Sequence, residues 1–208
     1  MCENQIVETM SSPDPATGNL PADLQKVLAD LDAADREAQR LVAGLSDEQV
    51  NWQPGGGTAW SVGQCLDHLT HGNSLYSSAM HDAVRSTKPE SAPRRGPISP
   101  GWFGRWFIRE MEPPPRRKLG APKKTVPSAR LNGAEVLKGF IGAHDRIRSL
   151  IAESLQLDLN RIRFKNPFIG AIRFTVGTGL LIIGAHDRRH LLQAGKVLEA
   201  MKRGSQAG

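Results

Sequence analysis

Apolar residues recur every three or four positions in four long stretches of the chain, which is the spacing of one face of an α-helix. In the first stretch, from Pro21 to Leu45, leucine, valine and alanine form one stripe and charged residues lie opposite. Three further stretches with this spacing cover about 61–86, 133–155 and 175–202. The pattern therefore predicts four long helices.

Short signals mark where some elements begin and end. Ser46 and Ser61 are each followed three residues later by glutamine, which is the spacing of a capping box. A run of three glycines, 55–57, separates the two. A shorter helix is predicted for GWFGRWFIREM (101–111), because the prolines that begin at 113 end it. Strand signals are few, with one small strand-like stretch before the last helix.

These elements predict an all-α fold, a four-helix bundle with a long crossover connection between helices two and three. Residues 1–20 are polar and contain two prolines, so we expect a disordered N-terminal tail there. We expect residues 21–208 to form a single domain with a basic, proline-rich insertion at about 87–132.

The positive charge of the protein is concentrated in this insertion. The formal net charge is +6, but residues 85–130 hold twelve lysines and arginines against three glutamates, together with nine of the 14 prolines. The rest of the chain is mildly acidic. A basic segment with aromatic residues could contact a membrane surface or nucleic acid. For nucleic acid, the cluster Arg116-Arg117-Lys118 would supply phosphate contacts.

The short helix at 101–111 favours a simpler interpretation of the same segment. Arg105 and Arg109 lie among its polar positions. We expect its apolar side to fold over the bundle as a lid, with the cations in solvent, and we do not favour nucleic-acid binding. That apolar side consists of Trp102, Phe103, Trp106, Phe107 and Met111.

The composition restricts the compartment. The longest apolar run, GLLIIGA at 179–185, is far shorter than the roughly 18 residues that span a bilayer. The first 21 residues carry acids and lack a basic start and an apolar core, so no secretory signal is expected. Two cysteines exclude a disulfide framework. We therefore expect a protein of the cytoplasm without a transmembrane segment.

The last predicted helix carries the clearest candidate for chemistry. His186 and His190 are four residues apart, so on a helix both rings project from one face and can reach a single metal ion. HDRRH is similar to the HExxH pattern of zinc proteases, but Asp187 is one methylene shorter than Glu and no third ligand follows. We therefore do not favour a protease. Asp187 and Asp67 each adjoin a histidine and are expected to form ion pairs on the flank.

Two histidines seldom hold a metal alone, so a third ligand is expected from another helix. Pairs with this spacing are often solvated. This pair, however, shares its side with Ile182, Ile183, Gln193 and Val197, and burying unpaired imidazoles costs free energy that a metal would offset. The histidines on other predicted helices are His68, His71, His81 and His144.

Two distant segments, TAWSVGQCLDHLTHGNSLY (58–76) and GAHDRRHLLQAGKVL (184–198), resemble the DinB-like family of metal-binding four-helix bundles. GWFGRWFIREMEPPPRRKLGAPK (101–123) is similar to the middle of one large branch of that family. The resemblance covers nearly all of 21–203. It implies that His68, His186 and His190 bind a divalent ion with open positions for water. Zn²⁺ is the first choice for this ion and Ni²⁺ the second.

The same resemblance implies a function. Relatives use a metal to lower the pKa of a low-molecular-weight thiol, so the chain is expected to be a metal-dependent enzyme, a thiol-dependent transferase or a hydrolase, acting on a small-molecule substrate. It also implies a homodimer. The alternative is a non-catalytic, stress-related metal-binding or interaction module.

Residues near His68 have two interpretations each. Gln64 could hydrogen-bond a metal ligand or a metal-bound water, or only cap its helix. His71 or Cys65 could close the site as a fourth ligand, which would favour a structural metal. Otherwise His71 would face solvent or line a pocket, and Cys65 would pack as a small buried residue. Tyr76 could line a pocket or pack in the core.

Overall fold

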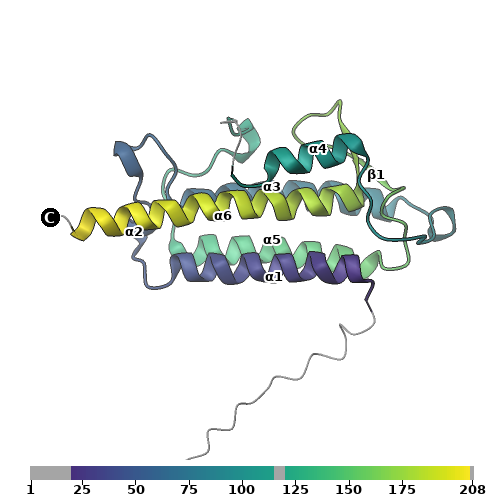
Figure 1. Ribbon diagram of the computed structural model, residues 1–208, viewed down its shortest axis with the longest axis horizontal. Coiled ribbons are helices and arrows are strands. Elements are labelled where there is room, and N and C mark those ends of the chain that lie inside the picture. Colours follow the sequence, from purple (N-terminus) through teal and green to yellow (C-terminus); the bar gives the residue numbers. More distant parts are fainter. Residues whose placement is uncertain (1–19, 115–119, 207–208) are drawn as a thin grey trace, which may run out of the picture.

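The computed structural model describes residues 20–114 and 120–206, and this part of the chain is mostly helical, as predicted (Figure 1). The long helices are close to their predicted ranges. The α-helices are α1 (Ala22–Val42), α2 (Asp47–Val50), α3 (Val62–Arg85), α4 (Trp102–Met111), α5 (Gly133–Glu153) and α6 (Val176–Gln206). Short 3₁₀ turns cover Pro54–Gly56, Pro89–Ser91 and Lys123–Thr125.

The four long helices lie side by side (Figure 1). Each helix of one pair, α1 and α3, packs against both helices of the other pair, α5 and α6. Residues of α3 and α6 that are more than a hundred positions apart are therefore neighbours, and these two helices carry the candidate histidines.

Both predicted capping boxes are present. The Ser61 hydroxyl accepts a hydrogen bond from the Gln64 backbone N–H, and the Gln64 side chain accepts one from the Ser61 N–H. Ser46 and Gln49 form the same pair at the start of α2. Each pair gives partners to backbone groups that the first turn of a helix leaves free.

The strand-like stretch before the last helix is a small antiparallel hairpin. Strands β1 (Arg163–Lys165) and β2 (Arg173–Thr175) pair with Phe164 opposite Phe174. Both rings are buried, while the arginines and the lysine on either side of them are exposed. The hairpin thus closes one end of the molecule with an apolar inner side and a cationic outer side.

The core consists of two apolar clusters with polar side chains between them. One cluster joins the N-terminal half of α1 to the C-terminal halves of α3 and α5 and the N-terminal half of α6. The other cluster occupies the opposite halves of the same helices. The buried polar residues between them include one from each long helix, namely Asp35, Asn73, His144 and Asp187.

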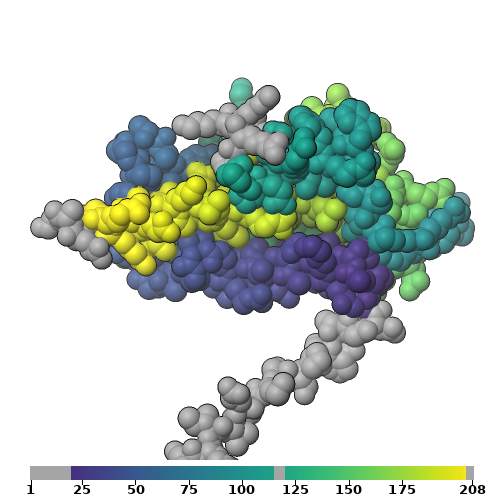
Figure 2. Space-filling model, viewed as in Figure 1, coloured from purple at the N-terminus to yellow at the C-terminus, as the bar shows by residue number. Residues whose placement is uncertain are grey.

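The long connection between α3 and α5 contains α4, which lies on α6 (Figures 1 and 2). Gly104 permits this approach, because a Cβ there would come within 2.9 Å of Cγ2 of Thr178. Phe107 packs on Phe174. The prediction that the whole aromatic side faces inward is wrong in one respect: Trp102 and Trp106 are exposed.

No helix in the described ranges is long and apolar enough to cross a membrane. The predicted disordered tail lies outside the described residues apart from Leu20, and so does the predicted cluster Arg116-Arg117-Lys118.

Candidate metal centre

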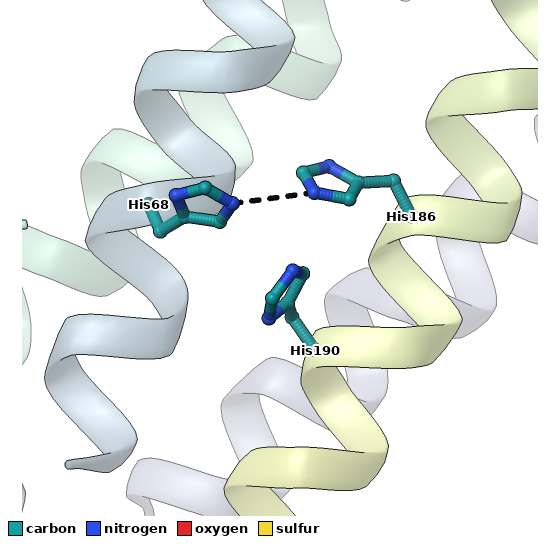
Figure 3. A group of neighbouring side chains, drawn as sticks. All are labelled: His68, His186 and His190. Carbon is teal, nitrogen blue, oxygen red and sulfur yellow. Dashed lines mark hydrogen bonds between the residues drawn. The ribbon is translucent and has the colours of Figure 1, made fainter. Parts of the chain in front are cut away.

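The structure brings His68, His186 and His190 together between two helices (Figure 3). His68 projects from α3, and the other two project from consecutive turns of α6. One nitrogen of each ring lies within 4.8 Å of one nitrogen of each of the others. Nε2 of His68 and Nε2 of His186 are 3.2 Å apart. The three rings thus converge on one small volume.

Two hydrogen bonds orient the rings. Nδ1–H of His68 donates to the backbone carbonyl oxygen of Thr125 at 2.7 Å. Nδ1–H of His190 donates to Oε1 of Gln193, one turn further along α6, at 3.1 Å. Because a carbonyl oxygen can only accept, each bond places the proton on Nδ1 and leaves Nε2 of that ring unprotonated. Metal-binding histidines are commonly held in this way.

Desolvation keeps the rings neutral. Burial lowers the pKa of His68, and the bond to Thr125 opposes this only in part. Burial and then the neighbouring imidazoles lower the pKa of His186 well below its ordinary value. Burial and then the charge of His68 lower the pKa of His190 to about 3. Neutral imidazole is the form that binds metals, so all three rings are ready as ligands at pH 7.

An aromatic wall borders the rings on one side. The Trp60 indole, just before α3, stacks on His190 with ring centroids 5.7 Å apart and lies tilted against His68 at 4.7 Å. On α3, Gly72 faces His186, and a Cβ there would lie 3.6 Å from Cε1 of that ring. Trp60 restricts the positions of two imidazoles, and Gly72 lies close to the third.

The arrangement fits a divalent cation. Two nitrogens that bind one Zn²⁺ at about 2.0–2.1 Å with a near-tetrahedral angle lie about 3.3 Å apart. The 3.2 Å between the Nε2 atoms of His68 and His186 matches this spacing. Among the described residues, no cysteine or carboxylate joins the three imidazoles. The group therefore could hold a metal ion with three protein ligands.

Comparison with known proteins identifies the family of the chain. The family model of the DinB superfamily matches residues 30–194, which is most of the chain and contains all three histidines. The chain belongs to the DinB superfamily. A search of curated proteins found no match. The resemblance seen in the sequence motifs is thereby confirmed.

In this DinB superfamily protein, the nearby alternatives to the three histidines have other roles. His71 is exposed, and its Nδ1 lies 3.7 Å from the Asp67 carboxylate. Cys65 is fully buried, and burial raises the pKa of its thiol to about 12. Neither belongs to the group of converging ligand atoms. Asp67 therefore lies beside His71 and accepts from the backbone N–H of Ser128, and Cys65 packs in the core.

Gln64 is engaged as a helix cap. Besides the bond to Ser61, its Oε1 accepts from Nε2 of Gln53 at 2.9 Å, and its Nε2 donates to the Ser128 carbonyl. Tyr76 packs against Phe164, and its hydroxyl accepts from Nδ2 of Asn166 at 2.9 Å. Sequence reasoning named both residues as candidates but missed Gln193 as a partner of His190. The i, i+3 spacing from His190 is the signal that could have found Gln193.

Asp187 lies in the core rather than on the flank, which corrects its predicted position. It is 1% exposed, and its Oδ2 lies 3.2 Å from Nε2 of His144. On the other side of that ring, Nδ1–H donates to Asp35 at 2.7 Å. Burial alone would lower the pKa of His144, but Asp187 and then Asp35 outweigh it and raise the pKa to about 9. His144 is therefore a charged core residue between two carboxylates.

Proposed function

We propose that this chain is a metal-dependent enzyme built on the DinB four-helix bundle, with a divalent ion held by His68, His186 and His190. The convergence of three neutral imidazoles carries this proposal. Zn²⁺ is the first candidate and Ni²⁺ the second, because both accept nitrogen ligands. When bound, such an ion supplies Lewis acidity and lowers the pKa of a thiol or water beside it.

The protein's own residues would prepare this site. Thr125 and Gln193 hold two rings with their lone pairs inward. Trp60 shields those two rings from water on one side. Burial is the main cause that lowers the pKa of His186 and of His190, and the charge of Arg189 lowers both further. A cation this close to the rings favours an anionic small-molecule substrate or thiol.

The enzyme is favoured over the non-catalytic metal module by one feature. A structural zinc site is closed by four protein ligands, whereas a catalytic one keeps a position open. Within the described residues the cluster has three ligands, and neither His71 nor Cys65 supplies a fourth. We propose a low-molecular-weight thiol or water as the nucleophile, in a transferase or hydrolase of the cytoplasm. We also propose that the chain forms a homodimer.

Metal analysis of the purified protein tests the site. We expect about one divalent ion per chain in the wild type and a loss of most of it in His68→Ala, His186→Ala and His190→Ala. His71→Ala is the matched control, because this histidine is on the same helix but outside the cluster. Wild-type protein that holds no stoichiometric metal, or a control that loses as much as the others, would contradict the proposal.

Activity is tested separately on protein shown to contain metal. Turnover of electrophilic substrates with a panel of low-molecular-weight thiols should disappear in the three histidine variants and persist in His71→Ala. Stoichiometric metal without any thiol-dependent or hydrolytic turnover would support the metal site but contradict the enzyme activity, and would favour the non-catalytic module. Sedimentation analysis of the same samples measures the oligomeric state.

A further inference from the structure

The exposed side of α4 is a stripe in which tryptophan and arginine alternate. Trp102, Arg105, Trp106 and Arg109 follow the i, i+3, i+4, i+7 spacing of one helix face, and all four are exposed. Trp102 is 77% exposed and Trp106 is 44% exposed. Tryptophan contributes a large apolar surface, so two of them on one solvent-facing stripe indicate a surface that binds a partner.

The stripe cannot turn inward, because the other side of α4 is already packed. Phe103 stacks on Phe174 of β2 with ring centroids 5.8 Å apart, and Phe107 contacts the same ring. Close to them, Gly104 lies against Thr178 of α6. These contacts fix the rotation of the helix about its axis. The tryptophans are therefore held outward by the fold.

The arginines of the stripe are available for a partner. Arg105 donates to the backbone carbonyl of Pro100 at 2.7 Å. The ion pairs formed within residues 20–114 and 120–206 include neither Arg105 nor Arg109. The nearest acids in sequence are Glu110, which is half-buried, and Glu112, which pairs with Arg188. The exposed stripe itself is cationic.

The hairpin beside α4 adds charge and one aliphatic residue. It lies at the same end of the molecule as the start of α4 (Figure 1), and no acid occurs from 159 to 186. Ile169, in the turn between β1 and β2, is 48% exposed. The exposed cations in the hairpin and just before it are Arg161, Arg163, Lys165 and Arg173.

We propose that this face, the α4 stripe with the hairpin beside it, docks on the surface of an anionic lipid bilayer. Indole rings bind at the level of lipid headgroups, and arginines bind lipid phosphates. The inference is independent of the proposed enzyme activity. It assigns to α4 a second role besides that of a lid over α6.

Two other partners fit the same residues less well. A single-stranded nucleic acid would stack its bases on the tryptophans, but the aliphatic Ile169 offers no ring for stacking. In a symmetric dimer through this face, the cations of one copy would meet those of the other, which is repulsive. An anionic bilayer satisfies the charge and accepts both the aromatic and the aliphatic side chains.

Vesicle flotation of the full chain tests the proposal. We expect the protein to float with phosphatidylglycerol-containing vesicles, to float much less with phosphatidylcholine alone, and to be released by salt. The double variant Trp102→Gln/Trp106→Gln should lower partitioning by about tenfold or more, and Arg105→Gln/Arg109→Gln by about tenfold. The control is Arg36→Gln/Leu192→Gln, which removes one exposed cation and one exposed apolar side chain from α1 and α6.

Circular dichroism and metal content confirm that each variant is folded. Quenching of tryptophan emission by brominated lipids in the wild type, and its loss in the tryptophan variant, would further support docking through the stripe. Absence of flotation overturns the proposal, as does an equal loss in the control variant. Stripe-dependent binding of a single-stranded oligonucleotide without vesicle binding, or stripe-dependent self-association in sedimentation analysis, overturns it as well.

Discussion

Each of the three imidazoles at the candidate metal centre has a different neighbour. His68 is held by a main-chain oxygen of Thr125, and His190 by the side chain of Gln193 from its own helix. His186 lies against Gly72 of the facing helix, where a Cβ would be 3.6 Å from Cε1 of the ring. Only the bond to Gln193 depends on a removable side-chain acceptor. That bond is therefore the one that a substitution can test.

Gln193→Leu should weaken metal binding without removing a ligand. Loss of the acceptor frees the His190 ring to rotate and to change tautomer, and loss of such a partner typically costs about tenfold in metal affinity. Gln193→Glu keeps an acceptor and should retain the affinity. Competition with a chromogenic chelator measures the effect, with the exposed Gln39→Leu on α1 as control. Equal affinities for Gln193→Leu and wild type would contradict the role of this bond.

Individual helices and their contacts show what the sequence could predict. The apolar stripes and the two capping boxes predicted the long helices closely, because local spacing carries that information. The pairing of His186 with His190 is equally local. Their meeting with His68 was expected only from the family resemblance, since spacing along a chain does not determine which helices face each other.

Features that depend on tertiary contacts were not predictable. The direction of Trp102 and Trp106 depends on how Gly104 seats α4 on α6. The bond from His68 reaches a carbonyl 57 residues away, in a turn with no sequence signal. The pairing of Asp187 with His144 requires both residues to lie at the same depth in the helical body. In each case the deciding partner comes from another element.

Two glycines test how closely the elements pack. A Cβ at Gly179 on α6 would come within 2.7 Å of Sδ of Met80 and 2.8 Å of Cε1 of Phe164. Both of these residues are buried, so Gly179→Ala should cost about 1–3 kcal/mol of unfolding free energy. A Cβ at Gly142 on α5 would meet nothing within 4 Å, so Gly142→Ala should raise the free energy of unfolding by up to about 1 kcal/mol. Urea unfolding measures both, and equal stabilities would contradict the packing.

Across the whole molecule, the core is divided into two apolar clusters by a charged and hydrogen-bonded layer. His144 is 0% exposed and lies between Asp35 of α1 and Asp187 of α6. Asn73 of α3 donates to Asp187 at 2.9 Å. Breaking such a network leaves a buried charge without a partner, which is strongly destabilising. The layer therefore disfavours any packing in which one helix slides along the others.

The charge on His144 predicts how stability depends on pH. Its pKa is about 9 in the folded protein, above the ordinary value of 6.5. Its contribution to stability is therefore fully present below about pH 6.5 and is lost as the pH rises through about 9. Urea unfolding of metal-free protein should show a falling free energy of unfolding over this window. His144→Gln should flatten that slope, whereas the exposed His71→Gln should keep it. An unchanged slope in His144→Gln would contradict the assignment.

The oxygen that orients His68 is contributed by the peptide backbone of the connection between α3 and α5. Exchange of the side chain at position 125 leaves that oxygen in place, so a scan of point substitutions there will underestimate its importance. The carbonyl oxygen of Thr125 reaches His68 because of the path of the backbone in this connection, and the residue types there matter less. Insertions or deletions between 112 and 125 are the changes to which this imidazole is sensitive.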